Sequence, residues 1–67
     1  MPRGKVKWFH DLKGYGFILS EEHPEEVYVR FSDICSPGYR TLHKGDEVIF
    51  EIEKSSEGNI AKNVVRI

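Results

Sequence analysis

Short runs of β-branched and aromatic residues, each closed by glycine, proline or polar turn residues, dominate this sequence and constrain its fold most. Valine and isoleucine together number twelve, while alanine, leucine and methionine together number five. β-Branched and aromatic side chains favour strands, and the residues that favour helices are scarce in this chain. We therefore predict an all-β fold.

Five strand-like stretches can be marked between the turn signals. They span about residues 5–13, 15–20, 26–31, 46–53 and 60–67. We also expect a single helical turn after the third stretch, capped by Ser32. Short strands with turns between them and no convincing helix indicate a small barrel or a sandwich.

The size of the chain and its cysteine content limit what else it can be. With 67 residues we expect one domain over residues 1–67, with one small core and no deep active site. The single cysteine excludes an internal disulfide, and the scattered histidines match no metal-ligand spacing. No apolar run is long enough to cross a membrane, and no signal peptide is visible. We expect a cytoplasmic protein without metal, cofactor or membrane contact.

The second and third stretches are apolar on both faces, although only one face can be the core. Alternation gives one face of glycine, isoleucine and valine, and a second face of aromatic residues that also carries Arg30. Burying an unpaired guanidinium is expensive, so we expect the aromatic face to point outward. The adjacent Trp8 and Phe9 require a bulge if both are to be buried. We predict inward positions for Gly16, Ile18, Val27, Val29, Phe9 and Phe50.

Large rings interleaved with lysine and arginine on an exposed sheet face indicate a partner that is both planar and anionic. Nucleic-acid bases stack on rings while their phosphates meet the cations. One such ring is usually part of a core, but several in register mark an interaction site. The net charge of −1 argues against a general polyanion binder, yet residues 1–20 are basic and residues 21–26 are acidic. The sequence therefore favours binding of single strands on one face.

Five segments resemble the cold-shock domain family. Residues 13–18 and 27–31 are similar to its two ribonucleoprotein motifs, and residues 4–9, 38–42 and 44–48 are similar to its opening strand, long loop and fourth-strand entry. The resemblance covers essentially the whole chain and indicates a bacterial-type cold-shock protein. It implies a five-stranded antiparallel barrel of the OB type that binds single-stranded RNA and DNA, with no enzymatic activity.

The resemblance also implies which residues bind nucleic acid. Six rings would stack bases, and three basic side chains would contact phosphates or base edges. These residues are Lys7, Trp8, Lys13, Tyr15, Phe17, Tyr28, Arg30, Phe31 and Tyr39. The resemblance further implies that the protein is an RNA chaperone that counters secondary structure. Regulation of transcription or translation during cold stress is a related role. We expect a monomer, with a strand-exchanged dimer as the alternative.

Three departures from the family pattern bear on binding. Arg30 stands where the family usually has histidine, and His10 stands where it usually has asparagine or aspartate. Residues 58–61 replace a usual Gly-Pro-Gln-Ala run, which puts the contacts of that loop in doubt. The acidic residues of the 21–26 segment should repel phosphate. We place all three histidines in solvated loops, and we expect Arg3 and Lys5 to pair with glutamates of the fourth stretch.

Two other binding folds and an enzyme fit the sequence less well. No group of residues suits a catalytic triad or a carboxylate pair. An RNA recognition motif would need two amphipathic helices and an aromatic residue where Ser20 stands. A small SH3-like barrel could dock proline-rich peptides on the same rings, but it would not need basic residues beside them.

Overall fold

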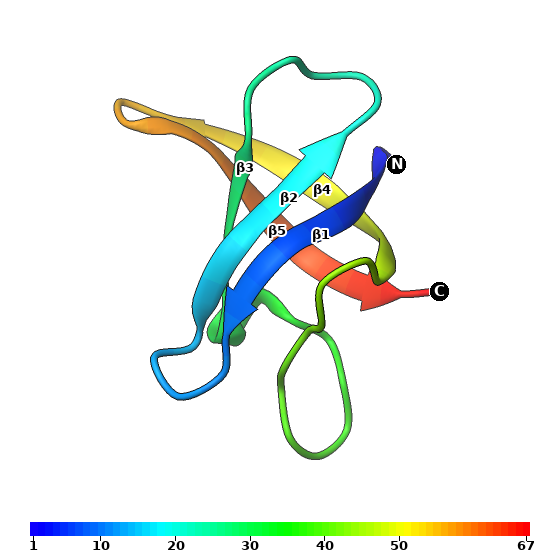
Figure 1. Cartoon of the computed structure of the whole chain (residues 1–67). Coiled ribbons are helices and arrows are strands. Elements are labelled where there is room, and N and C mark those ends of the chain that lie inside the picture. The colour runs from blue at the N-terminus through cyan, green and yellow to red at the C-terminus, as the bar shows by residue number, and fades with distance from the viewer.

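Five strands close into a barrel in the computed structural model, which describes residues 1–67 (Figure 1). The strands are β1 (Arg3–His10), β2 (Tyr15–Ser20), β3 (Val27–Arg30), β4 (Glu47–Ser55) and β5 (Gly58–Arg66). Their order around the barrel is β1-β2-β3-β5-β4, and β4 pairs with β1 to close it. The pairs are antiparallel except for β3 and β5, which run parallel at Tyr28 and Ile60. The predicted all-β barrel is confirmed.

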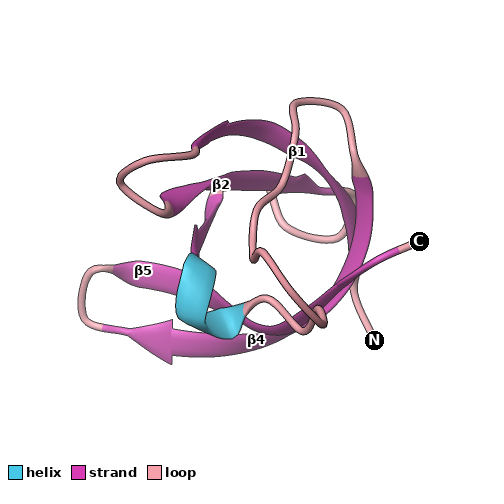
Figure 2. Cartoon of the chain, turned by 90° about the horizontal axis from the view of Figure 1, so that it is seen from below, coloured by secondary structure: helices cyan, strands magenta, loops and turns pink.

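Two local predictions need correction. The first strand ends at His10 rather than near Lys13, because a turn follows in which the Gly14 amide donates to the His10 carbonyl at 2.7 Å. The helical turn is a 3-10 turn, η1 (Phe31–Asp33), and Ser32 lies inside it instead of capping it. Its N-terminal cap residue is Arg30, without a side-chain cap. Figure 2 shows this turn across one end of the barrel.

Ten apolar side chains fill the barrel, and they come from every strand and from the long loop. Ile18, Val27 and Val29 are fully buried, which confirms that the uncharged face points inward. Phe50 is the largest fully buried side chain, and Phe9 packs against this core as predicted. The complete core is Val6, Ile18, Val27, Val29, Ile34, Leu42, Val48, Phe50, Ala61 and Val64.

Close contact between β1 and β2 depends on one bulge and one glycine. The pairing register shifts between Val6 and Trp8, so Trp8 turns outward opposite Phe17 while Phe9 turns toward the core. A Cβ atom at Gly16 would collide with backbone atoms of Trp8 and Phe9. The glycine thus allows the two strands to approach closely, and the consecutive aromatic residues reach opposite sides.

The remaining surface charges partly follow prediction. The Arg3 guanidinium lies 3.2 Å from the Glu47 carboxylate of β4, whereas Lys5 forms no ion pair. The predicted pairing with the fourth strand therefore holds for Arg3 alone.

No helix in the structure has the length and apolar character that spanning a membrane requires.

Candidate nucleic-acid interface

Four rings form a contiguous cluster on the outward face of β1, β2 and β3. The register sets Trp8 opposite Phe17 and Phe17 opposite Tyr28, so that one ring from each strand lies side by side. Ring centroids are 5.3 Å apart for Trp8 and Phe17, 5.6 Å for Phe17 and Tyr28, and 5.5 Å for Trp8 and Tyr15. We call Trp8, Tyr15, Phe17 and Tyr28 the ring cluster.

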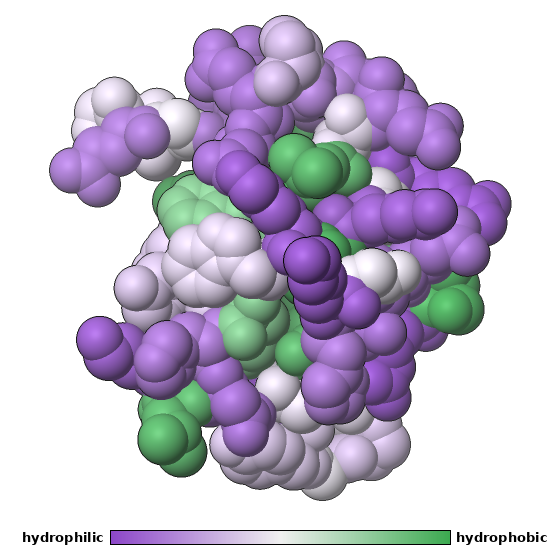
Figure 3. Space-filling model, viewed as in Figure 1, coloured by the Kyte–Doolittle hydropathy of each residue, from purple (hydrophilic) through white to green (hydrophobic).

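The ring cluster is neither core nor fully exposed. All four side chains are partly buried, and they meet at angles between 40° and 76°, so no two of them are stacked face to face. Green and pale atoms in Figure 3 form a patch over β2 and β3, with hydrophilic atoms on either side. The patch therefore offers ring surface to a ligand within a polar rim.

His10 extends the ring cluster. The sequence-based prediction missed this position of His10. Its imidazole lies parallel to the Tyr15 ring, with an angle of 3° and centroids 6.4 Å apart. The Lys13 amide donates to its Nδ1 at 3.1 Å, which fixes the ring at the end of β1. Alternation from Trp8 could have placed His10 on this face. His23 and His43 do lie in loops.

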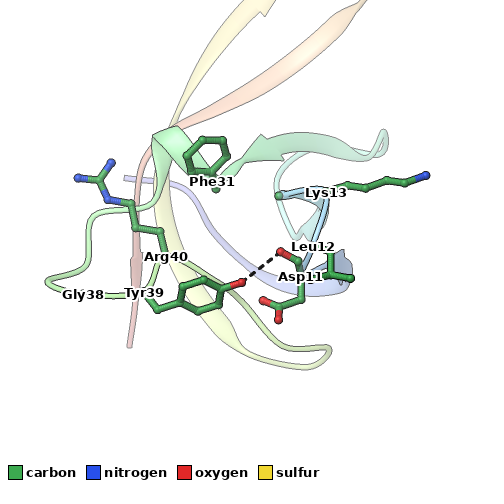
Figure 4. Close-up of a pocket in the computed structure, with 8 residues that line it drawn as sticks. Asp11, Leu12, Lys13, Phe31, Gly38, Tyr39 and Arg40 are labelled. Atoms are coloured by element: carbon green, nitrogen blue, oxygen red, sulfur yellow. Dashed lines mark hydrogen bonds between the residues drawn. The ribbon is translucent and has the colours of Figure 1, made fainter.

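Two further predicted rings lie away from the sheet, at a hollow between loops. Phe31 of η1 and Tyr39 of the long loop face this space, and their exposed fractions are 53% and 68%. The hollow measures about 450 Å³ and is also lined by Lys13 and Arg40, whose side chains extend in opposite directions in Figure 4. We call it the loop hollow. Arg40 is a basic residue that the sequence-based set omitted.

A hydrogen bond to Asp11 holds Tyr39 beside the loop hollow. The phenol donates to the Asp11 backbone carbonyl at 3.4 Å (Figure 4). The Thr41 hydroxyl donates to the Asp11 carboxylate at 2.8 Å. Hydrogen bonding to Asp11, followed by desolvation and by the negative charge of its carboxylate, raises the pKa of Tyr39 above its ordinary value. The contact with Asp11 therefore favours the neutral phenol.

Two of the three basic residues predicted to contact nucleic acid already form ion pairs with carboxylates. The Lys7 ammonium lies 2.7 Å from Glu26 Oε2, and the Arg30 Nε lies 3.3 Å from Asp33 Oδ2. Lys13 forms no ion pair. Exposed ion pairs contribute little stability, so a phosphate can replace the carboxylate partner of Lys7. The acidic 21–26 segment thus acts on this face through a direct contact.

A small closed barrel with an outward aromatic face and basic neighbours defines a nucleic-acid-binding domain of the OB type. The sequence profile described as the 'Cold-shock' DNA-binding domain matches residues 2–67. The chain is 49% identical to cold shock protein CspB of Bacillus caldolyticus over 67 residues, which span both chains completely. It is 43% identical to the cold shock-like protein CspE of Escherichia coli (strain K12) over 65 residues, covering 97% of this chain and 94% of that one.

The chain therefore belongs to the cold-shock domain family, whose members bind nucleic acid and are not enzymes. A solved structure of Drosophila Unr CSD456 superposes with a TM-score of 0.82. The match covers 98% of this chain and 26% of that one at 18% identity, so it bears on the fold alone. The predicted OB-type barrel is confirmed.

Proposed function

We propose that this protein binds single-stranded RNA and DNA with low sequence selectivity, along the ring cluster and the loop hollow. The observation that carries the proposal is the set of four adjacent, partly exposed rings whose centroids lie 5.3–6.0 Å from their neighbours. Base stacking on such rings contributes about 1–3 kcal/mol per base and tolerates any sequence, because every base has a π-face.

Each predicted residue has a role in this proposal. The rings of Trp8, Tyr15, Phe17 and Tyr28 stack bases over the sheet, and Phe31 and Tyr39 stack bases at the loop hollow. The cations contact phosphates or base edges, and these are Lys7, Lys13 and Arg30. Lys7 exchanges its carboxylate partner Glu26 for a phosphate when a strand binds.

Binding of this kind makes the protein an RNA chaperone. Bases stacked on protein rings are not free to pair, so strands that open by thermal motion are trapped in the open form. No ATP is required, because the binding free energy shifts the equilibrium. We propose that the chain works in this way as a monomeric domain in the cytoplasm. Cold stress, when RNA secondary structure is most stable, is the condition in which transcription and translation gain most from it.

The test compares a single strand with a duplex. We expect an oligo-pyrimidine strand to quench Trp8 fluorescence and bind with micromolar to nanomolar affinity. The estimate takes about four stacked bases and subtracts the ordering cost. A duplex of equal length should bind at least about tenfold more weakly, because its bases are already stacked inside the helix. A proline-rich peptide serves as the control ligand for an SH3-like groove. Equal affinity for the duplex, or tighter binding of the peptide, would contradict the proposal.

A further inference from the structure

A second hollow lies between the ring cluster and the β4–β5 hairpin, and we call it the hairpin cleft. Its volume is about 370 Å³. Phe17, Tyr28 and Arg30 line one side, and Glu57 and Asn59 of the hairpin line the other. The parallel pairing of Tyr28 with Ile60 holds the two sides together. This is the part of the face where the chain departs most from the family pattern, at Arg30 and at residues 58–61.

Asp33 contacts Arg30 at its Nε. The guanidinium donates from Nε to Asp33 Oδ2 at 3.3 Å, and the other oxygen of Asp33 accepts from the Lys62 ammonium at 3.3 Å. The Asp33 side chain is only 11% exposed, so it has little freedom to release Arg30. The two terminal nitrogens of the guanidinium have no protein partner. They remain as a rigid fork of donors beside the rings of Phe17 and Tyr28.

The hairpin side of the cleft includes one carboxylate, that of Glu57. The Glu57 amide donates to the Ser55 hydroxyl at 3.2 Å, which fixes the turn, and the Glu57 carboxylate forms no ion pair. A carboxylate is purely an acceptor. The hairpin cleft therefore combines ring surface for stacking with a pair of donors on one side and an acceptor on the other.

Guanine is the common base that matches this arrangement. It carries two adjacent acceptors, O6 and N7, on one edge, and these pair with a guanidinium fork. Its Watson–Crick edge carries two adjacent donors, N1–H and the N2 amine, which suit a carboxylate. Adenine places an N6 donor beside N7 and would oppose the fork, and the pyrimidines lack the O6/N7 pair. We infer that the hairpin cleft is a guanine-selective subsite within an otherwise sequence-tolerant site.

This inference rests on the proposed binding of single strands, and one experiment separates the two. Heptathymidine and seven variants with a single guanine at each position are titrated against the protein by Trp8 fluorescence. At one position, replacing thymine by guanine should raise the affinity of the strand at least about fivefold, and adenine at that position should give no gain. If heptathymidine binds and no guanine position gains, the inference is wrong and the proposed function stands. If no strand binds, both fail.

Ligand analogues test the contacts without altering the protein. At the favoured position, 7-deazaguanine lacks the N7 acceptor, and hypoxanthine lacks the N2 amine. We expect both to reduce the guanine preference, 7-deazaguanine through Arg30 and hypoxanthine through Glu57. A preference that survives both replacements would overturn the assignment of the cleft.

Protein variants complete the test. Arg30→Ala should remove the guanine preference, and Glu57→Gln should weaken it. Asp33→Asn should also weaken it, because the neutral amide holds the guanidinium less firmly. Lys13→Ala is the matched control, because it removes a cation outside the cleft. It should weaken the binding of heptathymidine and of the guanine variant equally, so that the ratio of their affinities stays unchanged. A guanine preference that persists in Arg30→Ala with its melting temperature unchanged would overturn the inference.

Discussion

Phe17 and Ile18 are neighbours in β2, but they belong to faces with different tasks. Ile18 points into the barrel with Val27 and Val29, and all three are fully buried. Phe17 points outward beside Tyr28 and is only partly buried, with a ring centroid distance of 5.6 Å. Both faces are apolar, so hydrophobicity by itself does not distinguish a core from an interface.

Charge and packing make the distinction. The inward face carries no charged side chain, whereas the outward face includes Arg30 and has the Lys7–Glu26 ion pair at its margin. The inward side chains interlock with the rest of the core, and the outward rings contact mainly one another. The inward face therefore contributes to folding, and the outward face keeps its ring surface for a ligand.

The largest effect that tests this comparison is on stability. Ile18→Ala should lower the free energy of unfolding by about 2–5 kcal/mol, because it leaves a cavity in a closed core. Urea denaturation followed by Trp8 fluorescence measures the loss. Leu19→Ala is the matched control on the same strand, since Leu19 is 49% exposed and its truncation should change stability by at most about 0.5 kcal/mol. Equal losses in the two variants would contradict the assignment of faces.

The next effect is on binding. Phe17→Ala should weaken binding of a pyrimidine heptamer by about 1–3 kcal/mol, because one stacking surface is lost. Its stability should fall much less than that of Ile18→Ala, since the ring lies outside the core. Titration and denaturation of the same preparation give both values, and Leu19→Ala again controls for loss of exposed apolar surface. Unfolding of Phe17→Ala with unchanged binding in Ile18→Ala would show that the faces are inverted.

The smallest effect concerns the ion pair at the edge of the outward face. Glu26→Gln frees Lys7 and should strengthen binding by at most about 1 kcal/mol. The parent should show a slope of log K against log salt of about −2 to −3, from three or four cations at roughly 0.7 each. In Glu26→Gln the slope should steepen by up to about 0.7, because binding in the parent leaves the Glu26 carboxylate without a partner, and the cation it then attracts offsets the counterion that Lys7 releases from the strand.

Glu25→Gln is the control for this prediction. It removes one charge from the same segment, but Glu25 forms no ion pair. It should leave the salt slope close to that of the parent. The same change in both variants would show that the segment acts through its overall charge and that the contact with Lys7 has no special role.

Sequence pattern predicted the strands and the two faces well, because both depend on the local period of two residues. It failed where the outcome depended on distant contacts. Ser32 looks like a cap, but burial of Ile34 and its bond to the Phe31 carbonyl place the 3-10 turn one residue earlier. Phe31 and Tyr39 were grouped with the sheet rings, whereas η1 and the long loop carry them to a separate hollow. His10 was placed in a loop although it ends β1.

The sequence by itself determined which side chains of β2 and β3 share a face, because alternation along a strand needs no information from elsewhere in the chain. Tertiary structure decided the carboxylate partners of Lys7 and Lys62. Glu26 reaches Lys7 through the β2–β3 loop, and Lys62 of β5 reaches Asp33 of the neighbouring η1. The parallel pairing of β3 with β5 also decided that the hairpin lies beside Arg30. Such contacts join residues far apart in the chain, and they exist only once the barrel has closed.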